Sequence, residues 1–136
     1  MNFQLILGVS ILQLLIAFLW FSPKLFGGIW NRINRIDGLS KHEIRELRKS
    51  AIPFYVLQFL LQFVTNTIIY VAVANAGFVG GAFAFLVWLG FMMPLVVQNE
   101  ICTKLENIPK LKRIFIVGGL FLVITVLAGL IFGFFR

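Results

Sequence analysis

Few residues of this sequence are suited to chemistry, and the most suggestive of them lie in long uncharged stretches. Gln58, Gln62, Thr65 and Asn66 follow the spacing i, i+4, i+7 and i+8, which places them on one stripe of a helix. Gln13 lies near the middle of another uncharged stretch. Such a stripe can line a pathway or a small binding cavity, or it can join helices through hydrogen bonds. The sequence favours the structural role, and a pathway is the alternative.

The inventory of reactive residues argues against an enzyme. The chain has no paired carboxylates, no metal-ligand cluster and no Ser/His/Asp set that would share a site. His42 and Cys102 are the single histidine and the single cysteine. They fall in different charged segments, where a Cys–His nucleophile is geometrically compatible but least favoured. We therefore expect no catalytic residue, no metal and no cofactor.

The elements that position the polar residues are defined by the distribution of charge. The 12 Lys and Arg and the 5 Asp and Glu lie between Lys24 and Lys49, between Glu100 and Arg113, or at Arg136. An isolated charge in hydrocarbon is costly, so a bilayer selects such uncharged stretches. The composition is 60% hydrophobic and the mean hydropathy is +0.99. These features predict an integral membrane protein of one domain.

The uncharged stretches predict an all-α, polytopic fold with four transmembrane helices. The expected spans are residues 2–21, 53–76, 81–98 and 114–135, and about 20 residues suffice to cross a bilayer core. Pro53 is expected in the first turn of the second span, where its missing N–H is harmless. Pro94 is expected to bend the third span near its end.

Basic residues predict the orientation of these spans. The connection at residues 22–52 holds seven Lys and Arg and that at 98–113 holds four, whereas residues 77–80 and the N-terminal stretch hold none. By the positive-inside rule, both basic connections face the cytoplasm and both termini face outward. We expect a multi-pass protein of the inner (cell) membrane.

Residues 29–50 are predicted to form a short amphipathic, cytoplasmic helical segment between the first two spans. Apolar residues recur at helical spacing at Ile29, Trp30, Ile33 and Ile36, and Ser40 and Glu43 match a capping box before a helix from Lys41 to about Ser50. A basic amphipathic segment of this kind suits an anionic inner leaflet. Nucleic acid is not expected as a partner, since the basic residues flank spans.

The fourth span carries a glycine face formed by Gly118, Gly129 and Gly133. The spacing Gly129-x-x-x-Gly133 permits close helix approach. This face is expected to pack within the monomer or across a subunit contact. Trp88, near the middle of the third span, is expected to lie between helices.

The end of the first span resembles the signature of a prokaryotic membrane family catalogued as domain of unknown function 1761. The residues that carry this similarity are Trp20, Phe21, Ser22, Pro23, Phe26, Gly27 and Trp30. Leu89-Gly90-Phe91 with Pro94 and Asn99, and the glycines Gly119, Gly129 and Gly133, resemble weaker motifs of the same family. Leu120-Phe121 departs from the Tyr-His that members often carry. The resemblance implies four transmembrane helices and supplies no activity.

Ser22-Pro23 is expected to end the first helix at the cytoplasmic boundary, with Phe26-Gly27 permitting a sharp turn. Trp20 and Trp30 would anchor that turn at headgroup level. This corner is expected to lie against residues 90–99.

Two functions are compatible with these features. The first is a non-enzymatic, homo-oligomeric helical bundle that binds membrane lipid, a small apolar molecule or a membrane partner. The alternative is an oligomeric channel or uniporter whose pathway is lined by Gln58, Gln62, Thr65 and Asn66. The sequence identifies neither a ligand nor a subunit number.

Overall fold

Long helices account for nearly all of the structure, a computed structural model that describes residues 2–77, 79–102 and 109–135. Within these ranges there is no strand, and 4 helical stretches are long and apolar enough to cross a membrane. The all-α, four-span prediction is therefore confirmed at the level of helix length and composition. The elements are α1 (Phe3–Trp20), α2 (Gly27–Ile33), η1 (Ile36–Gly38), α3 (Lys41–Ala76), α4 (Gly80–Val87), η2 (Trp88–Met92), α5 (Met93–Cys102) and α6 (Lys110–Phe135).

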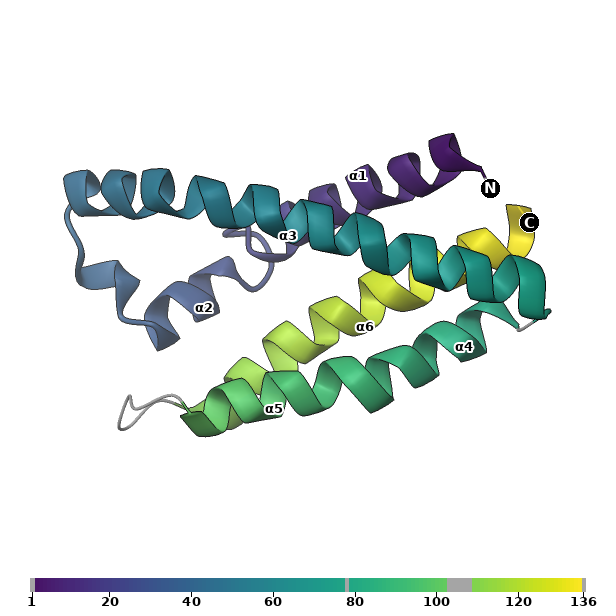
Figure 1. Cartoon of the computed structure of the whole chain (residues 1–136). Helices are drawn as coiled ribbons and strands as arrows, with labels where there is room; N and C mark the ends of the chain where they lie inside the picture. The colour runs from purple at the N-terminus through teal and green to yellow at the C-terminus, as the bar shows by residue number, and fades with distance from the viewer. Residues whose placement is uncertain (1, 78, 103–108, 136) are drawn as a thin grey trace.

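The helices form two pairs that meet at one end of the molecule and diverge toward the other (Figure 1). One pair is α1 with α3, and the other is α6 with the continuous run of α4, η2 and α5. Both chain ends and the α3–α4 connection lie at the closed end, and α2 lies at the open end (Figure 1). Helix α6 is central, since it contacts α1, α2, α3, α4 and α5.

The apolar core lies toward the closed end, where the pairs meet. Its buried side chains come from α1, α3 and α6, and they are Ile6, Val9, Ile69, Val73, Ala128 and Phe132. Tyr70 packs edge-on against Phe132 with ring centroids 5.5 Å apart. The convergence of the helices thus follows from side chains of three helices that bury one another.

Helix α3 differs from the expected arrangement of a short helix followed by a span that starts at Pro53. The structure has one helix of 36 residues with Pro53 inside it. A proline in a helix interior removes the hydrogen bond to the carbonyl four residues earlier, here that of Lys49. Lys49 is exposed beside the charged turns, so water can bond the released carbonyl. The helix therefore continues through Pro53.

The start of α3 confirms the predicted capping box. The Ser40 hydroxyl accepts from the Glu43 N–H at 3.3 Å, and the Ser40 N–H donates to the Glu43 carboxylate at 2.7 Å. Hydrogen bonds from Ser40, first through its side chain and then through its backbone, lower the pKa of the Glu43 carboxyl from its ordinary 4.5. This reciprocal bonding starts the helix at Lys41.

The third span contains a π-helical turn where the sequence predicts a proline bend. In η2 the Met93 N–H bonds to the carbonyl of Trp88, five residues earlier. The proline ring of Pro94 would clash with a carbonyl four residues earlier in a regular helix. The wider turn just before Pro94 relieves this conflict.

The glycine face of α6 packs within the monomer. A β-carbon on Gly80 would overlap the carbonyl oxygen of Gly129, and one on Gly129 would overlap the carbonyl oxygen of Gly80. Gly133 lies against Gly80 as well, and a β-carbon on Gly118 would meet the Met93 sulfur at 2.8 Å. Of the two predicted contacts for this face, the structure therefore shows the intramolecular one, between α6 and the α4–α5 run.

Trp88 ties the same two elements together. Its side chain is half-buried, and its Nε1 donates to the carbonyl oxygen of Gly118 at 2.8 Å. The expected position between helices is confirmed.

Candidate ligand-binding site

Three polar side chains from α1 and α3 form a closed hydrogen-bonded cluster at mid-depth of the bundle. The Gln13 amide nitrogen donates to Asn66 Oδ1 at 3.2 Å and to the Ile124 carbonyl at 2.8 Å. The Asn66 amide nitrogen donates to Gln13 Oε1 at 2.7 Å and to Ser10 Oγ at 2.8 Å. Ser10 in turn donates to the carbonyl of Ile6. All three side chains are buried.

This amide cluster (Ser10, Gln13 and Asn66) has no N–H left for a ligand. An amide nitrogen has two hydrogens, and both are used in Gln13 and in Asn66. Since the bonds join α1, α3 and α6, the cluster acts as an interhelical clasp. For Gln13 and Asn66 the geometry supports the structural interpretation.

The other members of the predicted stripe do not continue the cluster. Gln58 is exposed, and Thr65 donates to the Leu61 carbonyl of its own helix at 3.0 Å. Gln62 is buried, and its amide nitrogen has no partner among the described residues. The predicted stripe is therefore not one continuous site. Asn66 links helices and Thr65 bonds within its own helix, whereas Gln62 is buried and Gln58 is exposed.

A buried ion pair lies at the open end, and the sequence interpretation missed it. The Nε of Arg113 donates to both carboxylate oxygens of Glu100, at 3.0 and 2.9 Å. The Nη1 of Arg113 donates to Asn34 Oδ1, and its guanidinium lies 5.1 Å from the ring centre of Trp30. These contacts join α6 to α5 and to the end of α2. The sequence does contain a signal for this pair, because Glu100 near the end of α5 and Arg113 near the start of α6 carry opposite charges.

The ion pair is shielded from solvent by its surroundings. The side chain of Arg113 is 11% exposed and that of Glu100 is 5% exposed. Charges buried to this extent need a partner and further hydrogen bonds to offset lost hydration. Asn34 and the Trp30 ring supply those interactions to the guanidinium.

Residues 20–30, which carry the resemblance to the family signature, form the corner between α1 and α2. This signature corner holds Trp30 in its position. The Trp20 indole donates to the Ile116 carbonyl at 3.0 Å, and its ring centre lies 4.6 Å from that of Phe26. Phe21 packs on Trp30 at 5.2 Å. Gly27 is required in the turn, because a β-carbon there would overlap the carbonyl of Phe21.

The backbone closes the same corner around Ser22. The N–H groups of Leu25 and Gly27 donate to the Ser22 carbonyl at 3.1 and 3.0 Å, spanning the exposed Pro23. The chain thus turns within a few residues from α1 into α2. This turn brings α2 back toward α6.

A pocket of about 380 Å³ opens where α2 and α6 meet the run of η2 and α5. Its walls join an apolar part to the ion pair, and the lining residues are Trp30, Met92, Leu95, Val96, Asn99, Glu100, Arg113, Val117 and Phe121. The predicted proximity of the signature corner to residues 90–99 is confirmed by this shared lining. We call this site the interfacial pocket. It combines an apolar wall with a polar end, as amphiphile sites do.

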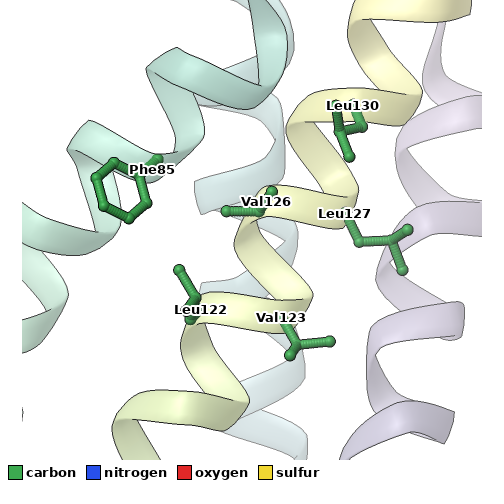
Figure 2. A pocket seen from close by; sticks show the side chains of 6 residues that line it. All are labelled: Phe85, Leu122, Val123, Val126, Leu127 and Leu130. Atoms are coloured by element: carbon green, nitrogen blue, oxygen red, sulfur yellow. The ribbon is translucent and has the colours of Figure 1, made fainter.

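A second hollow, of about 470 Å³, lies between α4 and α6 (Figure 2). Phe85 faces it from α4, and α6 contributes Leu122, Val123, Val126, Leu127 and Leu130. Its lining side chains carry no polar group to orient a ligand. Acyl chains of the bilayer can fill a surface of this kind.

No metal site is formed by the part of the chain that the structure describes, where no three His, Cys, Asp or Glu residues come together. His42 is exposed in the first turn of α3. Cys102 is exposed at the end of α5 and accepts a weak bond from Gln98 at 3.5 Å.

Comparisons with known proteins bear on the family of the chain and not on its ligand. The family model described as "Protein of unknown function (DUF1761)" matches residues 5–133. No curated protein and no solved structure gives a significant match.

Proposed function

The chain belongs to the DUF1761 family, and we propose that it is a non-enzymatic membrane protein that binds an anionic phospholipid in the interfacial pocket. The observation that supports this proposal is the composition of the pocket, which joins an apolar wall to a buried, paired arginine. A phospholipid has the same two parts.

The apolar wall suits an acyl chain. Met92 from η2 and Leu95 and Val96 from α5 line one side of the pocket, and Val117 and Phe121 from α6 line the other. The π-helical turn contributes to this wall, because it ends at Met92, whose sulfur accepts from the Thr125 hydroxyl at 3.2 Å. A volume of about 380 Å³ is enough for part of one chain and the adjoining ester region.

The polar end suits a phosphate-bearing headgroup. Arg113 and Glu100 together are neutral, and Lys110 and Lys112 lie within one turn of Arg113 on α6. This excess of positive charge favours an anionic lipid at the membrane surface. With this end at the membrane surface, Trp30 would lie at headgroup depth, where indole rings are common.

Orientation follows from the same positive charge. We propose that the open end faces the cytoplasm and that both termini face outward, in the inner membrane. Helix α3, at about 1.5 Å per residue, is about 54 Å long, whereas the hydrocarbon core is about 30 Å thick. Its first turns continue the span, so we propose that they extend away from the surface and that α2 makes the headgroup contact.

The ion pair also supports a binding role over a catalytic one. Among the residues that the structure describes, Glu100 and Arg113 are the titratable groups of the interfacial pocket, and each is engaged by the other. An oligomeric channel or uniporter remains a second candidate because of one observation, the unpartnered amide nitrogen of Gln62. Flux of ions or small solutes into liposomes that contain the native chain would support that candidate.

The test of lipid binding compares two identical substitutions on α6. Val117→Trp fills the interfacial pocket, whereas Val126→Trp fills the apolar hollow. We expect the native chain to retain phosphatidylglycerol over phosphatidylcholine by native mass spectrometry. Val117→Trp should lower that retention about tenfold or more, and Val126→Trp should leave it unchanged.

Two results would contradict the proposal. One is equal retention of the two lipids by the native chain. The other is equal retention of phosphatidylglycerol by the two variants, once circular dichroism has shown that both are folded.

A further inference from the structure

The cytoplasmic half of α3 is almost uncovered. From Ile52 to Leu61 every side chain except Phe59 is exposed, and Phe54 is 71% exposed. The preceding turns, from Lys41 to Ser50, are exposed at every position except the half-buried Ile44. We refer to residues 41–51 as the stalk, because they carry the charges that keep them out of hydrocarbon.

The stalk has an apolar stripe that lipid cannot cover. Its apolar residues are Ile44, Leu47 and Ala51, at intervals of three and four. This is the a and d spacing of a coiled coil. Leu47 is 51% exposed. Contact with a second apolar surface would remove this stripe from water and stabilise the helix.

The same spacing continues into the membrane span through Phe54, Gln58 and Leu61. With Ile44 as position a, Gln58 also occupies position a and lies next to the axis of a paired helix. A polar residue at one a position fixes register and partner number in coiled coils. A glutamine amide has both a donor and an acceptor, so it can bond to its own copy at the same depth.

Charge complementarity indicates the partner. Glu43 falls at position g and Arg48 at position e of the next heptad, and these two positions face each other between parallel helices. Two copies related by a twofold axis would therefore form two Glu43–Arg48 pairs. Each residue is exposed and has no ion pair within its own chain among the described residues.

We propose that α3 forms a parallel coiled-coil dimer with α3 of a second copy of this chain, along Ile44, Leu47, Ala51, Phe54, Gln58 and Leu61. A twofold axis along the membrane normal keeps both copies in the same orientation. The interface lies on α3, and the interfacial pocket is formed by α2, η2, α5 and α6. Dimerisation and lipid binding can therefore be tested separately.

Cysteine cross-linking of the full chain in membranes tests the interface. In a Cys102→Ser background, Leu47→Cys and Leu61→Cys place thiols at d positions, where two copies approach closely enough for a disulfide. The matched controls are Lys49→Cys, two residues from Leu47, and Leu60→Cys, one residue from Leu61, both exposed on the same helix. Under mild oxidation we expect a covalent dimer from both d-position variants and at least tenfold less from the controls.

A charge substitution tests the partner's identity. Arg48→Glu would place two Glu43 residues opposite two new glutamates, whereas Arg45→Glu makes the same change of charge at an outward position. We expect the first to weaken dimerisation about tenfold and the second to leave it nearly unchanged. Light scattering in detergent gives the dimer fraction.

Three outcomes would overturn the proposal. They are a native chain that stays monomeric at all concentrations in detergent and in nanodiscs, equal cross-linking at d positions and controls, and equal effects of the two charge substitutions. The first outcome would indicate that a different protein covers the stalk.

Discussion

At the scale of single residues, two amide side chains on α3 differ in whether their hydrogen-bonding groups have partners. Asn66 has both amide hydrogens and its oxygen engaged, whereas the amide nitrogen of Gln62, one turn away, is buried without a partner among the described residues. A satisfied amide in a low-dielectric interior stabilises the bundle, and an unsatisfied one costs free energy. Although both side chains are amides, their different hydrogen bonding predicts opposite effects of substitution on stability.

Replacement of each amide by leucine tests this contrast. Asn66→Leu removes three hydrogen bonds and leaves the Gln13 amide partly unsatisfied, so we expect a loss of about 1–3 kcal/mol in the free energy of unfolding. Gln62→Leu removes an unpaired donor and should be neutral or stabilising. Reversible unfolding in mixed micelles, followed by circular dichroism, measures both. A larger loss from Gln62→Leu than from Asn66→Leu would show that Gln62 has a ligand or water partner.

At the scale of elements, the sequence predicted the helices well and their interruptions poorly. The uncharged stretches located the four spans, and the pairing of Ser40 with Glu43 located the start of α3. The continuous passage through Pro53 was missed because the cost of a lost backbone bond depends on whether water reaches the released carbonyl. The π-helical turn before Pro94 was missed because a bend and a wider turn relieve the same clash.

Close approach of α4 and α6 is the element-scale feature most sensitive to one atom. Gly80→Ala would place a methyl group on the Gly129 carbonyl. The helices must separate, and we expect a loss of about 1–3 kcal/mol in the free energy of unfolding. Gly8→Ala is the matched control, since a β-carbon on Gly8 meets nothing within 4 Å. Equal stability of the two variants in mixed micelles would contradict the close contact.

At the scale of the whole molecule, the interfacial pocket depends on three elements that the sequence could not orient. The sequence placed Glu100 and Arg113 in one charged connection, but their pairing depends on the rotation of α5. An extra residue in the π-helical turn rotates everything after it by about 100° relative to a regular helix. This rotation decides whether Glu100 faces α6. Family-signature residues, in contrast, did indicate the corner that carries Trp30.

The arrangement of the whole chain across the membrane can be tested with its own cysteine. Cys102 is exposed at the open end, and Asn75 is exposed at the closed end. If the open end is cytoplasmic, a membrane-impermeant maleimide should label native Cys102 in spheroplasts only after permeabilisation. Asn75→Cys in a Cys102→Ser background should be labelled without it. Exchange of the two patterns would invert the orientation, and labelling of both from one side would contradict the separation of the two ends by a bilayer.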